Sequence, residues 1–160
     1  MKKHVVRAPQ TDRYGFEVPC SAADLDCSNT VIATETETVA VESSGRELAA
    51  TEIVDDPKSV VTSQSPLTIS PRVPGLYMAV VTVRWDALMA YADRALGVSV
   101  LVNGSIVGGK VDSGRFGASH WTQTTVLFRV AAGDAVTFEV SAIPTTTMNS
   151  AEVDLIQVAP

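Results

Sequence analysis

The sequence predicts an all-β protein with the layout of a jelly-roll sandwich and an extended N-terminal arm. Valine, threonine, alanine and serine are abundant, a composition typical of globular β proteins. Short strand-like segments recur at regular spacing from residue 30 onward, separated by turn signals, and eight or more strands are expected there. The domain is therefore expected over residues 30–160, which is long enough to form a hydrophobic core.

Residues 1–29 are expected to form the arm. Proline, glycine, aspartate and asparagine are scattered through this segment without a sustained period, apart from one possible helical turn near residues 21–25. The tip is basic, since Asp12 is the only acidic residue among the first thirteen. A solvated basic surface is one interpretation, and a surface that docks on an acidic partner is the other. The candidate docking residues are Lys2, Lys3, Arg7, Arg13, Tyr14 and Phe16.

The two cysteines, Cys20 and Cys27, also lie in the arm. A disulfide between them is geometrically possible, whereas two free thiols are favoured in a reducing cytoplasm. Only His4 and His120 could add zinc ligands of the usual type, and neither is near the cysteines in the sequence. No metal site is therefore expected.

The net charge of −6 arises in the middle of the chain, because residues 34–57 hold seven acidic side chains against Arg46. An acidic protein without a basic, aromatic-rich patch is not expected to bind nucleic acid. No apolar run reaches the ~18 to 20 residues of a membrane span, and the first residues lack the apolar core of a signal peptide. We therefore expect synthesis in a cytoplasm and no membrane insertion.

Residues 30–64 are expected to contain one or two strands followed by irregular β structure. Thr38 to Glu42 alternate between apolar and polar residues, and Ser43–Ser44–Gly45 is a turn signal. Residues 45–59 have some helical propensity, but their surroundings favour a β excursion. The strand signal becomes strong at Leu67, where a short strand precedes a proline-rich turn.

The most apolar strand is expected over residues 75–85, where side chains alternate between two faces. The row expected in the core consists of Tyr77, Ala79, Val81, Val83 and Trp85. The opposite row begins with Leu76, Met78 and Val80 and then turns polar. A second apolar face on a core strand needs its own cover, so these three residues form a candidate interface with another copy of the chain.

Residues 86–95 are either a helix capped by Asp86 or a long loop. Strands over 96–102 and 105–111 are joined by Asn103–Gly104, the strongest short hairpin signal. The remaining strands are expected over residues 122–130, 135–142 and 151–159, with loops over 112–121 and 143–150. In the last strand the inward row is expected to shift from Leu155 to Ile156 at a bulge.

Three motifs carry a family resemblance: Gly75 with Tyr77 in a strand, Asn103–Gly104 in a hairpin, and Gly133–Asp134 in a turn before the penultimate strand. In this order they resemble the C1q/TNF-like jelly-roll superfamily, of the kind found in small bacteriophage virion proteins. The resemblance covers residues 65–158 well and residues 30–64 loosely. It implies assembly as a homotrimer about a threefold axis.

No catalytic set is apparent, because neither histidine lies in a nucleophile-elbow sequence and no glycine-rich phosphate loop opens a helix. We expect no enzyme activity and no cofactor. The first functional hypothesis is a structural virion protein, a trimeric capsid decoration (cement) protein. It would dock on the major coat protein through its arm, and its location would be the virion.

The alternative hypothesis is a receptor- or glycan-binding jelly roll at the tip of a phage head or tail fibre. Its candidate ligand loop contains aromatic and basic residues, as recognition loops often do. These residues are Arg115, Phe116, His120 and Trp121. A structural explanation is also open, in which Phe116 and Trp121 cap the barrel or line a subunit interface.

Overall fold

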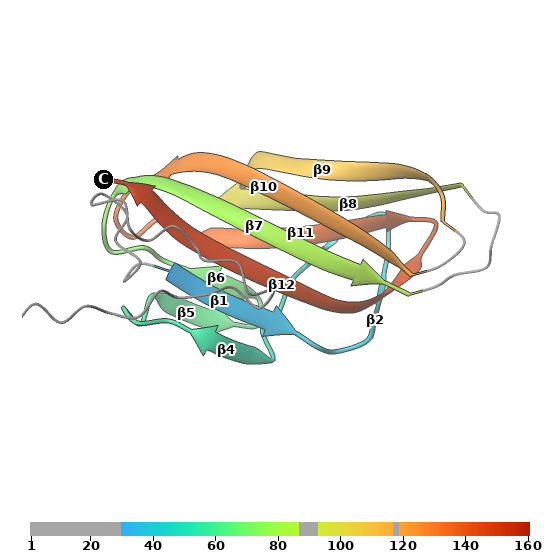
Figure 1. The fold of residues 1–160 in the computed structure, drawn as a ribbon, viewed down its shortest axis with the longest axis horizontal. Helices are drawn as coiled ribbons and strands as arrows, with labels where there is room; N and C mark the ends of the chain where they lie inside the picture. Colours follow the sequence, from blue (N-terminus) through green and yellow to red (C-terminus); the bar gives the residue numbers. More distant parts are fainter. Residues whose placement is uncertain (1–29, 87–92, 117–118) are drawn as a thin grey trace, which may run out of the picture.

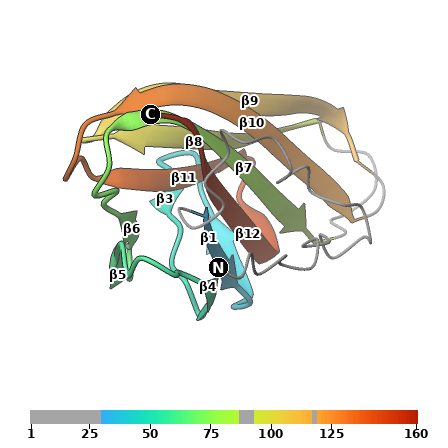
Figure 2. The same ribbon diagram turned by 60° about the vertical axis from the view of Figure 1, so that its left-hand side comes forward.

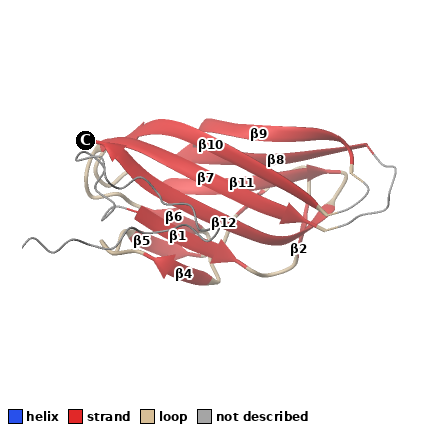
Figure 3. Cartoon of the chain, in the orientation of Figure 1, coloured by secondary structure: helices blue, strands red, loops and turns tan. Residues whose placement is uncertain are grey.

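The computed structural model describes residues 30–86, 93–116 and 119–160, and these ranges contain strands and loops but no helix (Figures 1 and 3). The first six strands are β1 (Thr30–Glu35), β2 (Val39–Val41), β3 (Arg46–Glu47), β4 (Glu52–Asp55), β5 (Val61–Gln64) and β6 (Leu67–Ile69). The six longer strands are β7 (Gly75–Trp85), β8 (Asp93–Val102), β9 (Ser105–Arg115), β10 (His120–Val130), β11 (Val136–Ile143) and β12 (Thr146–Ala159). The all-β prediction is confirmed. Within the described ranges, nothing forms a helix of the length and apolarity needed to cross a membrane.

Two sheets pack face to face (Figures 1 and 2). The first, here called the β7 sheet, has the order β10-β7-β12-β1-β4, and β2 also pairs with β12. The second, the β11 sheet, has the order β5-β6-β11-β8-β9, and β3 pairs with β11. Within the described residues, all pairings of neighbouring strands are antiparallel. Two antiparallel sheets whose strands are exchanged along the chain in this way form a jelly roll.

The core lies between the two sheets and contains the inward rows predicted from period-two patterning. In β7 these are Tyr77, Ala79, Val81, Val83 and Trp85, each at most 3% exposed. In β11 they are Val136, Phe138, Val140 and Ala142, each at most 1% exposed. The indole N–H of Trp85 donates to Thr122 Oγ1 at 3.1 Å, so its polar atom is satisfied inside the core.

Two motifs that are distant in the sequence meet at one end of the β8–β9 hairpin. Asn103 and Gly104 have φ angles of 50° and 77°, as a two-residue hairpin turn requires. The Asn103 side chain donates to Asp134 Oδ1 at 2.9 Å and accepts from the backbone N–H of Ala135 at 2.9 Å. Asp134 Oδ2 also accepts from the backbone N–H of Ala131 at 2.8 Å. The hairpin and the turn before β11 are thereby joined.

The β excursion expected over residues 45–59 is confirmed, since this segment contains β3, β4 and a turn. Residues 86–95 are in part strand, because β8 begins at Asp93, while residues 87–92 lie outside the described part of the chain. Strand β8 starts opposite the end of β9, where Asp93 pairs with Arg115 and the Arg115 Nε donates to Asp93 Oδ1 at 3.0 Å.

Both long loops expected in the second half of the chain are shorter than predicted. Strand β9 continues to Arg115 and β10 begins at His120, so only the residues between them connect the two strands. Strand β12 begins at Thr146 rather than residue 151, because Thr146 to Met148 pair with β2. Both extensions depend on partners that are remote in the sequence.

The expected shift of the inward row of the last strand is wrong. Gln157 is 6% exposed and continues the inward row after Leu155, while Ile156 is opposite Met78 on the other face. The register irregularity follows one residue later, between Gln157 and Ala159. Gly75 explains the buried amide, because a Cβ there would lie 2.8 Å from Gln157 Nε2.

Candidate functional site

The face of the β7 sheet that points away from the core carries an apolar patch. The strand register aligns Leu127 of β10, Met78 of β7 and Ile156 of β12 in one row. Leu127 is 59% exposed, whereas the other members of the patch are half-buried. We call this patch the outer apolar face, and it consists of Leu76, Met78, Val80, Leu127 and Ile156. The predicted interface residues of β7 thus lie together on this face.

Two members of the outer apolar face were not predicted there: Leu127 was not singled out from the sequence, and Ile156 was expected in the inward row. Leu127 stands between the buried Val126 and Phe128, so alternation alone assigns it to the outside. Its position beside Met78, however, depends on β10 pairing with β7. The face becomes polar in the row of Val80, which lies between Thr125 of β10 and Asp154 of β12.

The far end of the same face carries an aromatic side chain and an arginine. Trp121 is 54% exposed, and the Arg84 guanidinium lies 5.5 Å from the centroid of its ring. Next along β10, Gln123 Nε2 donates to Thr82 Oγ1 at 3.0 Å. Tryptophan and arginine are enriched in protein interfaces, so this end extends the candidate contact surface.

The four residues of the candidate ligand loop contact different partners and do not form one cluster. Arg115 pairs with Asp93 at 3.0 Å, and Trp121 lies under Arg84. Phe116 stacks on His120, with ring centroids 3.9 Å apart and an interplanar angle of 26°. Phe116 also packs against the core. Only Phe116 and His120 are therefore in direct ring contact.

Asp112 binds two basic side chains at this end of the molecule. Its carboxylate accepts from Lys110 Nζ at 2.9 Å and from His120 Nε2 at 3.1 Å. Burial raises the pKa of Asp112, but hydrogen bonds from Lys110, His120 and Thr122 outweigh this effect and lower it. These groups satisfy one another, which is typical of a structural network. No group of three or more metal-ligating side chains is present among the described residues.

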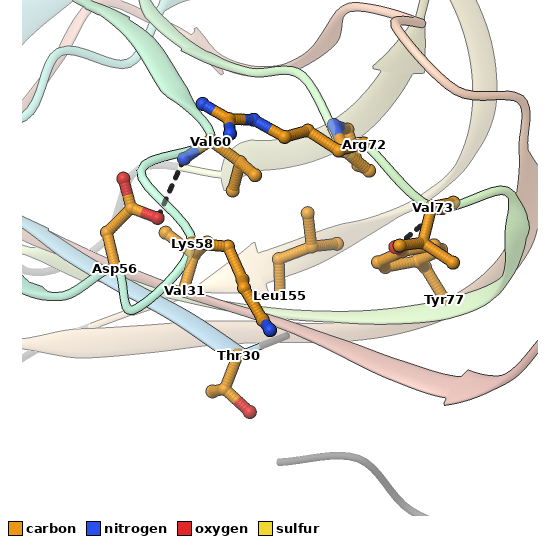
Figure 4. A pocket seen from close by; sticks show the side chains of 10 residues that line it. Thr30, Val31, Asp56, Lys58, Val60, Arg72, Val73, Tyr77 and Leu155 are labelled. Carbon is orange, nitrogen blue, oxygen red and sulfur yellow. Dashed lines mark hydrogen bonds between the residues drawn. The ribbon is translucent and has the colours of Figure 1, made fainter. Parts of the chain in front are cut away.

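A separate pocket of about 200 Å³ opens near the beginning of β7 (Figure 4). Its floor is made of buried side chains: Val31, Tyr77 and Leu155 of the β7 sheet, and Val60 of the connection before β5. Lys58 and Arg72 stand at its rim and are exposed. No local motif predicts this pocket, because segments far apart in the chain bring its walls together.

The candidate docking residues of the arm lie outside the described residues, as do Cys20 and Cys27. The docking residues are Lys2, Lys3, Arg7, Arg13, Tyr14 and Phe16. Their role stays a prediction.

No family model and no curated protein matches the sequence. Solved structures do resemble it. The globular domain of the zebrafish complement 1qA protein has a TM-score of 0.62 and 14% identity, covering 81% of this chain and 97% of that one. Murine APRIL, in a crystal structure at pH 5.0, has a TM-score of 0.58 and 12% identity, covering 81% and 98%. At such identities the likeness concerns the fold, and this chain has the C1q/TNF-like jelly-roll fold predicted from its motifs.

Proposed function

We propose that this chain is a homotrimeric structural protein of a virion, a capsid decoration protein without enzymatic activity. The outer apolar face carries this proposal. It lies on an antiparallel sheet whose other face already forms the core, so water or a partner must cover it. Burying a fully exposed aliphatic side chain contributes about 1.5 to 3 kcal/mol, so Leu127 would gain most of this and the half-buried members less. The resemblance to the C1q/TNF-like superfamily supports three copies.

The arm supports the virion role. Its basic tip and its aromatic residues, Tyr14 and Phe16, suit a coat-protein surface that is acidic and partly apolar. A trimer would present three arms, which bind with avidity when the lattice spacing lets them engage together. Self-association and coat docking would then use different parts of the chain.

The solution mass of the full chain, measured by light scattering and by sedimentation equilibrium, tests the trimer. We expect three times the monomer mass for the wild type. Leu127→Glu should yield monomers, because it places a charge in the outer apolar face at a side chain that is 59% exposed in one copy. Ile106→Glu is the matched control, since Ile106 is 66% exposed but lies on the β11 sheet. A monomeric wild type contradicts the proposal.

Co-sedimentation with purified coat-protein shells tests the decoration role. The wild-type chain should bind shells, and the double variant Tyr14→Ala, Phe16→Ala should lose binding while its mass remains that of a trimer. A trimer that ignores shells from its own source would reject decoration and leave the oligomer intact.

A receptor- or glycan-binding tip is the second candidate, favoured by the exposed Trp121 beside Arg84. Glycan-array binding that Trp121→Ala abolishes, together with indifference to the arm variants, would support it. It ranks second because the other residues of the candidate loop have partners within the protein. These are Arg115, Phe116 and His120.

A further inference from the structure

The pocket near the beginning of β7 reaches the core of the sandwich. Val31 and Leu155 are 1% exposed and Tyr77 is 3% exposed, so the floor is formed by side chains that also pack between the sheets (Figure 4). The pocket volume is about 200 Å³. An apolar cavity of about 150 Å³ is large enough for benzene, so this pocket suits an apolar group of roughly six to eight carbon atoms.

The floor offers little hydrogen bonding to a ligand. The only polar atom of the four floor side chains is the Tyr77 hydroxyl, which donates to the carbonyl oxygen of Val73 at 2.8 Å. Burial raises the pKa of Tyr77, so this phenol remains neutral. An apolar ring or chain is therefore the group that this floor favours.

The rim, in contrast, is positively charged. Figure 4 shows Arg72 on one side of Leu155 and Lys58 on the other. The Arg72 guanidinium donates to the carbonyl oxygen of Ser59 at 3.3 Å. In the part of the chain that the structure describes, neither cation forms an ion pair, and both side chains are exposed.

Asp56 also lines the pocket, but its carboxylate forms hydrogen bonds with the backbone of the following turn. Its two carboxylate oxygens accept from the backbone N–H groups of Val60 at 2.9 Å and Val61 at 3.0 Å. With two cations and one carboxylate, the rim has a net positive charge. An anionic group is therefore the complementary partner.

We propose that this pocket binds a small monocarboxylate whose apolar ring or chain has about six to eight carbons. The apolar part contacts Val31, Val60, Tyr77 and Leu155, and the carboxylate lies between Lys58 and Arg72. The site is distinct from the outer apolar face and would give the chain a small-molecule binding function independent of its assembly. A dissociation constant on the order of 0.1 mM is expected for a ligand of this size.

Octanoate and 3-phenylpropionate are suitable probes for the full chain. Calorimetry should show one saturable site, and methyl NMR should show shifts centred on Val31, Val60 and Leu155. The uncharged analogues octanol and 3-phenylpropanol should bind at least tenfold more weakly. The absence of saturable shifts at these methyl groups up to 10 mM probe would overturn the proposal, and so would an alcohol that binds as tightly as its acid.

Variants test the two halves of the site. Lys58→Gln with Arg72→Gln should weaken binding of either acid at least tenfold. The charge-matched control, Lys110→Gln with Arg115→Gln, removes exposed cations at the other end of the molecule and should leave binding unchanged. Val73→Trp, at a rim residue that is 41% exposed, should block the pocket without unfolding the chain. Equal affinity in the wild type and either pocket variant would reject the assignment.

Discussion

Two buried charged side chains differ in whether the described structure supplies a counter-charge. Glu35 is 2% exposed, and its carboxylate accepts from Arg46 Nη1 at 2.7 Å and from the backbone N–H of Ala49 at 2.8 Å. Arg94 is 8% exposed and donates to Thr146 Oγ1 at 2.7 Å, but its Nε has no hydrogen-bond partner. Replacing Arg46 and replacing Arg94 by an apolar residue should therefore change the free energy of unfolding in opposite directions.

Arg46→Met should destabilise the protein by about 2 to 4 kcal/mol, because it leaves the Glu35 carboxylate buried without its counter-charge. The pair also connects β1 of one sheet with β3 of the other. Denaturant unfolding measures the change. Arg115→Met is the control, since the Arg115–Asp93 pair is exposed and should cost less than about 1 kcal/mol. Equal losses in the two variants would contradict this interpretation.

Arg94→Met should leave the stability unchanged or raise it by about 1 to 2 kcal/mol, because the described residues give this buried guanidinium no counter-charge and Met is an apolar side chain of similar length. Thr146 would keep its hydrogen bond to the carbonyl oxygen of Pro144 at 2.8 Å. The melting temperature of the variant checks the sign. A clear fall would mean that the Arg94–Thr146 bond outweighs the cost of burying the charge.

Asn103→Ala should raise the pKa of Asp134 towards its usual value. Hydrogen bonds from Asn103 and Ala131 lower this pKa in the wild type. A carboxyl group whose pKa is lowered by folding stabilises the folded state at pH values above its ordinary pKa of about 3.9. This stabilisation is lost as the pH falls through the pKa of the folded state. Carboxyl NMR titration of Asp134 in both proteins measures the shift. An unchanged titration would show that Ala131 alone is responsible.

Strand β9 depends on two adjacent glycines that face different neighbours. A Cβ at Gly108 would lie 2.4 Å from Val126 Cγ1 of β10, and a Cβ at Gly109 would lie 2.4 Å from the carbonyl oxygen of Val98 of β8. The strand therefore approaches the side chains of the other sheet and the backbone of its own sheet at the same point. This closes the sandwich along the β9 and β10 edges.

Gly108→Ala and Gly109→Ala should each destabilise the protein by about 1 to 3 kcal/mol through overpacking. Val126→Ala should reduce the destabilisation caused by Gly108→Ala, because the shorter side chain makes room for the added methyl group. It should not reduce the destabilisation caused by Gly109→Ala, because the Val98 carbonyl oxygen stays in place. Denaturant unfolding of the single and double variants gives the coupling energies. Rescue of Gly109→Ala by Val126→Ala would refute this assignment of the two contacts.

The elements that the sequence predicts well are those with local signals. Period-two rows placed Val81 and Phe138 in the core, and the Asn103–Gly104 turn fixed the β8–β9 hairpin. The ends of β9, β10 and β12 were misjudged because they depend on remote partners, such as Val41 opposite Thr146. Gln157 was misjudged because the space above Gly75 is visible only in three dimensions.

The candidate site divides in the same way. Alternation alone predicted that Leu76, Met78 and Val80 point away from the core row, and the structure agrees. Leu127 and Ile156 join them only through the strand order β10-β7-β12, which pairs segments far apart in the chain. The pocket between Lys58 and Arg72 depends on two turns that share no local motif.

On the scale of the whole molecule, the two ends and the outer face have different chemistry. The outer apolar face runs along the β7 sheet, the Asp112 network closes one end of β7, and the pocket lies near the other end. Assembly through the outer apolar face would therefore cover neither the rim of the pocket nor the Asp112 network. The free energy of unfolding should then include a contribution from assembly, and this contribution increases with protein concentration.

A trimer unfolds to three separate chains, so its melting temperature should rise with protein concentration. By mass action, a hundredfold increase adds about 1.8 kcal/mol per chain, which corresponds to roughly 6 °C for a domain of this size. Calorimetry at concentrations that differ a hundredfold measures this shift. Leu127→Glu should melt at a temperature independent of concentration, and Ile106→Glu should behave as the wild type. A wild-type melting temperature that does not move would mean that the outer apolar face is left to water, and its side chains would then stabilise the fold only through contacts within one copy.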